Sequence, residues 1–185
     1  MNLAKKQQNI IINLVKTNRD WQGFVKNQYI NRSNFLYDIA KKIEIIFSFT
    51  ELKKLNKQIY EINLNLTNNK AITKINAKFR QKNQPTNIIA FPFLSHQNIA
   101  SKGIVSTVSQ FGQYIFLGEL FLSYQVIKLE ASEHNKTFVN HFYHLITHGI
   151  LHLLGYDHIN DDDAKIMEDL EIKILNYLGI ENPYL

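Results

Sequence analysis

Residues 148–158 read His148-Gly149-Ile150-Leu151-His152-Leu153-Leu154-Gly155-Tyr156-Asp157-His158. His148 and His152 are four residues apart, so on a helix both imidazoles project from one face about one turn apart. Gly155 can adopt the left-handed conformation that ends a helix, and the chain then turns to bring His158 toward the same point. This stretch predicts a helix that ends near a glycine, with three imidazoles gathered at that end.

The three histidines are candidate ligands for one Zn²⁺ ion per chain. The sequence has no cysteine, which excludes disulfides, thiolate zinc sites and a cysteine nucleophile, so a metal site must use histidines and carboxylates. Three imidazoles leave one position of a tetrahedral zinc ion open for water, as in catalytic zinc sites. The alternative interpretation is a set of half-buried helix histidines without a metal.

The same spacing occurs in zinc endopeptidases with the signature H-E-x-x-H-x-x-G-x-x-H, in which the glutamate is the general base. Gly149 occupies that position here, so the ligand pattern is present while the peptidase base is absent. A phosphodiester substrate suits the remaining groups better, because a metal ion and an arginine can neutralise charge on phosphoryl oxygens. We expect Arg80 to be that arginine; alternatively, it only stabilises the C-terminus of a helix.

The composition favours one domain, residues 1–185, large enough to bury a core. No stretch approaches the roughly 20 apolar residues that span a bilayer, so we expect a cytoplasmic protein without membrane contact. The 21 Lys and Arg and 16 Asp and Glu are unevenly placed, since residues 1–100 carry +11 and residues 101–185 carry −6. The basic half could attract nucleic acid, or it could reflect a coding bias toward Lys, Asn and Ile.

Hydrophobic periodicity predicts an α+β fold. Alternating or β-branched runs predict strands at 9–15, 59–66, 86–91 and 114–124. Apolar residues at helical spacing predict helices at 34–47, 69–80, 125–133, 138–154 and 161–178, with a loop over 92–112. We therefore expect a small mixed sheet of four or five strands flanked by helices. The zinc site would lie on a helix and the loop after it, an arrangement like that of metalloproteases.

Three blocks of the sequence resemble the YbeY family of bacterial rRNA maturation factors. They are residues 75–80 leading into 85–92, residues 117–120, and residues 141–158 continuing to Glu171. The resemblance implies a metal-dependent endoribonuclease that cleaves single-stranded ribosomal RNA in 16S 3′-end processing and in ribosome quality control. It also implies the small ribosomal subunit as a partner, and no DNA substrate.

The resemblance also implies roles for single residues. It makes the three histidines of residues 148–158 zinc ligands and Arg80 the arginine of the catalytic pocket. His144 lies one turn before His148 and looks like a further cleft residue, which relays a proton, packs or supports a ligand. Asp157 is expected either to orient a ligand imidazole or to cap the turn.

The sequence departs from the family pattern at three positions. Glu119 stands in place of an aspartate and keeps the charge on a longer side chain, and we expect it in the cleft or beside the ligands. Asn87 and Ala90 replace an aspartate and a serine. If either carboxylate position assists catalysis, these changes alter the rate or the metal preference.

Two other functions fit the same residues. One is a metallopeptidase of divergent mechanism, in which His144 or Glu119 replaces the missing base. The other is a non-catalytic ribosome-assembly factor, in which zinc is structural and Lys and Arg side chains bind rRNA. Metal removal separates the last case from catalysis, because loss of a structural zinc ion unfolds a protein that depends on it.

Overall fold

The structure is a computed structural model that describes residues 9–55, 58–94, 99 and 103–185. The strands are β1 (Asn9–Thr17), β2 (Ile59–Thr67), β3 (Ile88–Pro92) and β4 (Tyr114–Ser123). The α-helices are α1 (Arg19–Gln28), α2 (Arg32–Ser48), α3 (Asn69–Arg80), α5 (Ile104–Val108), α6 (Tyr124–Glu133), α7 (Phe138–Leu153) and α8 (Asp161–Tyr177). Short 3-10 turns occur at Glu51–Lys54 and Ser109–Phe111. The predicted α+β class is confirmed.

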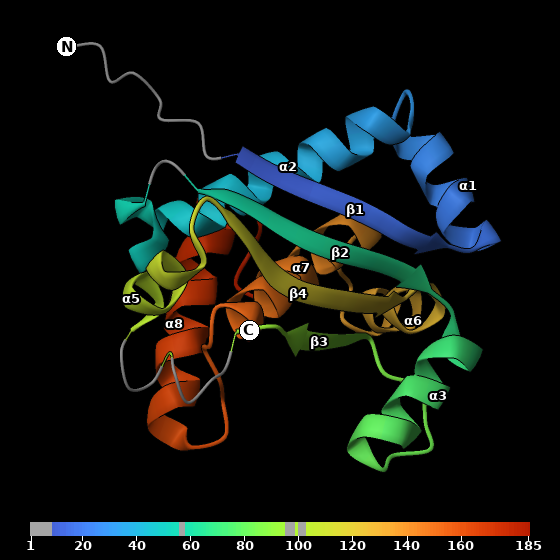
Figure 1. Ribbon diagram of the computed structural model, residues 1–185. Helices are drawn as coiled ribbons and strands as arrows, with labels where there is room; N and C mark the ends of the chain where they lie inside the picture. Colours follow the sequence, from blue (N-terminus) through green and yellow to red (C-terminus); the bar gives the residue numbers. More distant parts are fainter. Residues whose placement is uncertain (1–8, 56–57, 95–98, 100–102) are drawn as a thin grey trace.

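The strands form one mixed sheet in the order β1-β2-β4-β3 (Figure 1). β1, β2 and β4 are parallel, and β3 runs antiparallel to β4. Parallel neighbours require crossover connections, and the connection from β1 to β2 contains α1 and α2. In Figure 1, α2 and α7 lie behind the sheet and cover one of its faces. The expected mixed sheet is confirmed, and the helix that carries the histidines packs on it.

The core lies between this face of the sheet and helices α2 and α7. Its fully buried members include Tyr60, Ile62, Leu64 and Leu66 of β2, Ile39, Ile43 and Ile46 of α2, and Phe142, Ile146 and Ile150 of α7. Burial of one large apolar side chain contributes about 1.5–3 kcal/mol. This layer therefore stabilises the fold and fixes the position of α7 on the sheet.

Helix α1 was not predicted from the sequence. Asn18 caps it by accepting a hydrogen bond from the backbone N–H of Trp21 at 3.2 Å. The Trp21 side chain is fully buried, and its indole N–H donates to the carbonyl of Thr67 at 2.9 Å. Trp21, Phe24 and Val25 are buried and have helical spacing, so a short apolar period was present in the sequence and the prediction overlooked it.

The predicted loop over 92–112 is partly wrong. Residues 95–98 and 100–102 of this segment lie outside the described residues. Ile104–Val108 forms α5, in which Ile104 and Val108 are buried. A helix of five residues is too short to show a hydrophobic period in the sequence. The burial of Ile104 and Val108, which only the structure reveals, accounts for its position.

Gly118 allows β4 to approach β3 closely at a β-bulge. The pairing of β2 with β4 shifts between Phe116 and Gly118, which leaves Leu117 as the extra residue. Gly118 has a φ of 139°, and a Cβ atom there would lie 2.2 Å from the carbonyl oxygen of Phe91. Only glycine fits this backbone conformation and this contact.

We expect Gly118→Ala to lower the free energy of unfolding by roughly 2–4 kcal/mol, because it adds both backbone strain and a clash with β3. Urea unfolding followed by circular dichroism measures this change. Gly23→Ala is the matched control, since a Cβ atom at Gly23 in α1 meets no atom within 4 Å. The control should be neutral or stabilise by up to about 1 kcal/mol. Equal stability of both variants would contradict the proposed role of the bulge.

Candidate metal centre

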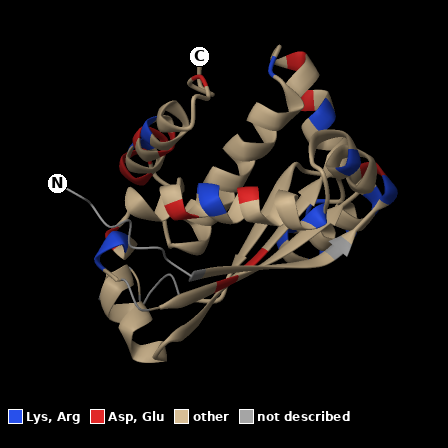
Figure 2. Cartoon of the chain, turned by 90° about the horizontal axis from the view of Figure 1, so that it is seen from above, with Lys and Arg blue, Asp and Glu red and all other residues tan. Residues whose placement is uncertain are grey.

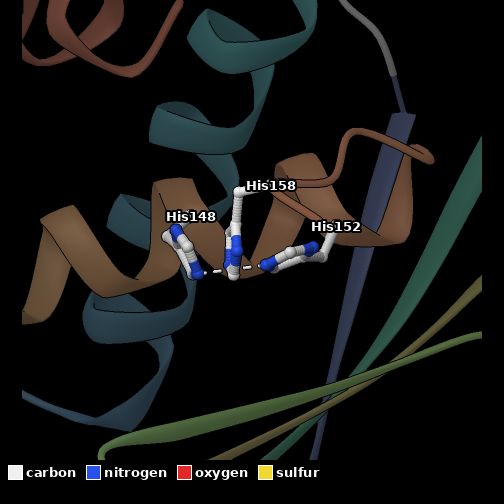
Figure 3. A group of neighbouring side chains, drawn as sticks. All are labelled: His148, His152 and His158. Carbon is white, nitrogen blue, oxygen red and sulfur yellow. Dashed lines mark hydrogen bonds between the residues drawn. The ribbon is translucent and has the colours of Figure 1, made fainter. Parts of the chain in front are cut away.

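The three predicted ligands come together at the end of α7. His148 and His152 project from the last turns of the helix, and His158 returns from the loop that follows (Figure 3). One ring nitrogen from each lies within 4.8 Å of the others. The Nε2 atoms of His148 and His152 are 3.0 Å apart. The three imidazoles therefore surround a common point, as the spacing predicted.

Gly155 produces the reversal that brings His158 back. It has a φ of 87°, and the backbone N–H of Tyr156 donates to the carbonyl of Leu151 at 3.0 Å, which closes the end of α7. A Cβ atom at Gly155 would lie 2.8 Å from the side chain of Ile99. Both the left-handed backbone and the close packing require glycine here.

Hydrogen bonds orient two of the three imidazoles. His148 Nδ1 lies 2.8 Å from a carboxylate oxygen of Glu171, and His152 Nδ1 lies 3.0 Å from the carbonyl oxygen of Tyr156. Both partners are acceptors, so each Nδ1 carries a hydrogen and each Nε2 is the ring nitrogen left to face the common point. The two Nε2 atoms lie 3.0 Å apart, close enough to share a hydrogen bond when one of them is protonated and to bind one metal ion together when neither is. Tetrahedral zinc with Zn–N bonds of 2.0–2.1 Å places two ligand nitrogens about 3.3 Å apart, so the residues fit such an ion.

The surroundings shift the pKa values of two groups at this site, His152 and Glu171. Burial, reinforced by the neighbouring His148 and His158, lowers the pKa of His152 to about 4, so its ring is neutral at physiological pH. Burial alone would raise the pKa of Glu171, but hydrogen bonds from His144, His148 and Tyr184 outweigh it and lower the value to about 2. The Glu171 carboxylate is therefore ionised, and the His152 ring is neutral as a metal ligand has to be.

Glu171 is the functional residue that the sequence analysis did not assign to the site. It lies on α8, and its side chain is fully buried against α7. The signal was present, because Met167 and Ile174 place position 171 on the apolar stripe of a predicted helix. A carboxylate at such a position is almost never fully buried unless it is paired. The sequence did not show which group pairs with the Glu171 carboxylate.

A cavity of about 750 Å³ opens in front of the histidines, on the helix-covered side of β3. Arg80 and Lys82 line it together with Asn87, His148 and His152. Helix α3 ends at Arg80, and Gln81 adopts the left-handed conformation with a φ of 58°, so the chain turns directly after the arginine. The structure thus brings Arg80 to the same cavity as the candidate ligands, as expected, and adds Lys82.

Asp157 and Asn87 also line the cavity. A carboxylate oxygen of Asp157 accepts a hydrogen bond from the backbone N–H of His158 at 2.8 Å, so of its two expected roles the contact found is that of a turn cap. The Asn87 amide donates to the carboxylate of Glu130 at 3.0 Å. An aspartate at this position would face Glu130 with a like charge, so the amide suits this neighbour.

Two predicted cleft residues do not line this cavity. His144 Nε2 lies 3.6 Å from Glu171, and its Nδ1 is buried without a hydrogen-bond partner in the described structure. Glu119 accepts hydrogen bonds from Asn63 at 3.2 Å and Asn65 at 3.4 Å. The next residue, Leu120, faces α7, so Glu119 points to the opposite face of the sheet.

The packing of α7 on the sheet favours a small residue at the position of the peptidase base. A Cβ atom at Gly149 would lie 2.6 Å from the terminal methyl group of Ile88 and 2.8 Å from one of Leu120, so both side chains would have to shift to accept it. Gly149 also lines the cavity, but glycine supplies no group that could serve as the base of the H-E-x-x-H mechanism.

We expect Glu171→Gln to weaken Zn²⁺ affinity by roughly 10- to 100-fold, because glutamine still accepts a hydrogen bond from His148 but carries no charge. Competition with a chromophoric chelator measures the affinity. Glu168→Gln removes the same charge from an exposed position on the same helix and should leave the affinity unchanged. Equal affinities for both variants would show that Glu171 does not support the ligand.

Comparison with known proteins identifies the family. The family model described as Endoribonuclease YbeY matches residues 25–179. Proteins named Endoribonuclease YbeY from Francisella tularensis subsp. novicida and subsp. holarctica are 44% identical over 125 residues, which cover 68% of this chain and 72% of theirs. A solution structure from Thermotoga maritima has a TM-score of 0.51 at 22% identity and covers 90% of this chain and 87% of its own, which supports the fold. This chain therefore belongs to the YbeY family.

Proposed function

We propose that this protein is a zinc-dependent endoribonuclease that cleaves single-stranded ribosomal RNA. The observation that carries the proposal is the convergence of the ring nitrogens of His148, His152 and His158 on one side of a cavity whose other side presents Arg80 and Lys82. A metal site opposite two cations suits a substrate that is an anion. The name of its curated relatives, Endoribonuclease YbeY, indicates that this anion is the RNA backbone.

In this proposal one set of residues holds the metal ion and another holds the phosphate. His148, His152 and His158 would hold one zinc ion, which when bound supplies Lewis-acid polarisation of a phosphoryl oxygen. Arg80 binds a non-bridging phosphate oxygen and stabilises the negative charge that develops there. Lys82 adds a second positive charge at the same cavity.

His144 acts in this proposal through Glu171 and not from the cavity. Its Nε2 atom faces the carboxylate at 3.6 Å, while only 16% of its side chain is exposed. A protonated or N–H-bearing ring at this place stabilises the ionised carboxylate that holds His148. The expected proton relay to the substrate would require a path to the cavity, and His144 does not line it.

Helix α3 extends the cationic surface beside the cavity. Lys70, Lys74 and Lys78 are exposed and follow one another at intervals of four residues, and the helix contains no acidic residue. Figure 2 shows Lys and Arg interspersed with Asp and Glu along the chain, and within the basic half α2 carries Asp38 and Glu44 among its basic residues. Helix α3 has no such acidic residues, so its positive charge beside the cavity supports contact with an RNA backbone.

The biological setting is part of the same proposal. Single-stranded 16S rRNA of the small ribosomal subunit would be the substrate, in 3′-end maturation and in ribosome quality control. Such a role places the protein in the cytoplasm. Within the described ranges, no helix combines the length and apolar character needed to cross a bilayer.

We expect Arg80→Ala to lower the rate of RNA cleavage by about 10²-fold, because one preorganised charge on the reacting phosphate is lost. His152→Ala should remove activity, since two imidazoles do not hold the ion in the same place. Lys173→Ala is the charge-matched control on the exposed face of α8 and should cleave like the wild type. The assay is incubation with labelled single-stranded rRNA, and equal cleavage by all four proteins would refute the nuclease proposal.

Metal removal tests whether zinc serves catalysis or the fold. The core between sheet and helices does not include the three histidines, so we expect chelator-treated protein to keep its circular dichroism spectrum and cooperative unfolding but to lose RNA cleavage. Added Zn²⁺ should restore cleavage. Unfolding on chelation would instead favour the assembly factor with structural zinc, and zinc-dependent cleavage of a peptide library without RNA cleavage would favour a peptidase.

A further inference from the structure

The C-terminal residues fold back toward the metal centre. Helix α8 ends at Tyr177, and Gly179 has a φ of 73° that turns the chain. The backbone N–H of Ile180 donates to the carbonyl of Leu175 at 2.9 Å, which closes this turn. Further along, Lys136 Nζ donates to the carbonyl of Pro183 at 2.7 Å and ties the tail to the segment before α7. These contacts place Tyr184 beside α7 and α8.

Tyr184 contacts the carboxylate that supports the metal ligand. Its hydroxyl donates a hydrogen bond to Oε2 of Glu171, whose other oxygen, Oε1, accepts from His148 Nδ1 at 2.8 Å. The Tyr184 ring also meets the His144 ring edge to face, with centroids 6.1 Å apart and planes at 78°. Tyr184 and His144 thus close the side of Glu171 that faces away from His148.

We propose that Tyr184 is a positioning residue for the zinc ligand His148, acting through Glu171. A carboxylate can rotate about its last side-chain bond, and a rotation would carry Oε1 away from the imidazole. The Tyr184 hydroxyl holds Oε2 and so prevents this rotation, because the remaining donor to Oε2, His144, lies at the long distance of 3.6 Å. Oε1 of Glu171 is then kept within hydrogen-bond distance of His148 Nδ1.

The family assignment does not account for this contact. The YbeY family model ends at residue 179, so Tyr184 lies beyond the residues that it matches. The inference rests on the proposed metal site but not on the proposed RNA substrate. Zinc binding is therefore its readout, and a failure to cleave RNA would leave it standing.

The test is Zn²⁺ affinity of Tyr184→Phe, which removes the hydroxyl and keeps the ring. We expect the affinity to fall about threefold to tenfold, less than the roughly 10- to 100-fold typical of groups that contact a ligand directly. Tyr177→Phe is the matched control, because Tyr177 is 69% exposed and its ring contacts Phe49 away from Glu171. The Nδ1–H signal of His148 in metal-free protein, observed by NMR, should change in Tyr184→Phe and not in Tyr177→Phe.

A double-mutant cycle shows whether Tyr184 acts through Glu171. In the Glu171→Gln background, Tyr184→Phe should cause little further loss of affinity, because the group through which it acts has already changed. Additive losses, or wild-type affinity in Tyr184→Phe, would overturn the inference. A loss of Zn²⁺ affinity accompanied by a loss of thermal stability in the metal-free protein would also overturn it, because that pattern is expected of a residue that only stabilises the fold. Wild-type protein that binds no zinc would overturn the proposed metal site itself and this inference with it.

Discussion

The packing of α7 on the sheet is the constraint on which the site depends. One face of this helix packs in the core, where its residues Phe142, Ile146 and Ile150 are fully buried. At Gly149 the helix comes so close to β3 and β4 that a Cβ atom would press on the side chains of Ile88 and Leu120. His148 and His152 line the cavity that opens beside this contact, next to β3. The orientation of the candidate ligands is therefore set by the same contacts that stabilise the core.

The buried carboxylate of Glu171 is the second requirement, and it would be destabilising by itself. Transfer of an ionised carboxylate into a protein interior costs several kcal/mol unless charge and hydrogen bonds compensate for it. His148, His144 and Tyr184 provide those contacts, from α7 and from the C-terminal tail. A cation held by His148 would add further compensation, since Glu171 would then face a positively polarised imidazole. Binding of a metal ion by His148 would therefore be coupled through this one side chain to the docking of α8 on α7.

The sequence predicted the clustering of the three histidines well because their geometry is local. His148 and His152 are related by one helical turn, and the glycine at 155 signals the reversal that brings back His158. The same holds for the strands and for the helices with a clear apolar period. Helix α1 was missed although Trp21, Phe24 and Val25 have helical spacing, because three apolar residues in a stretch of ten give a weak signal. The contact that fixes its position, from Trp21 to the carbonyl of Thr67, joins residues 46 positions apart in the chain and is not visible in the sequence.

The position of Glu119 shows why the other site residues were harder to place. In a regular strand Glu119 would share the face of Ile115 and Leu117, which are both buried. The bulge at Leu117 reverses the alternation, so that Leu120 and Leu122 take over the core side and Glu119 points away from α7. One inserted residue thus moves a carboxylate from one side of the sheet to the other. Only Gly118 marks the bulge in the sequence, and a glycine within a strand does not by itself show that a bulge is present.

Residues from the basic half and from the acidic half of the sequence meet at the cavity. Arg80 and Lys82 come from the basic half of the sequence, whereas the histidines and Glu171 come from the acidic half. A cation held by the histidines and the side chains of Arg80 and Lys82 repel one another, so they cannot approach without an anion between them. Glu171 lies behind the ligands and supports them without facing the cavity. With a cation on the histidines, the cavity would present positive charge from two sides toward its open centre, an arrangement that a phosphate group would stabilise.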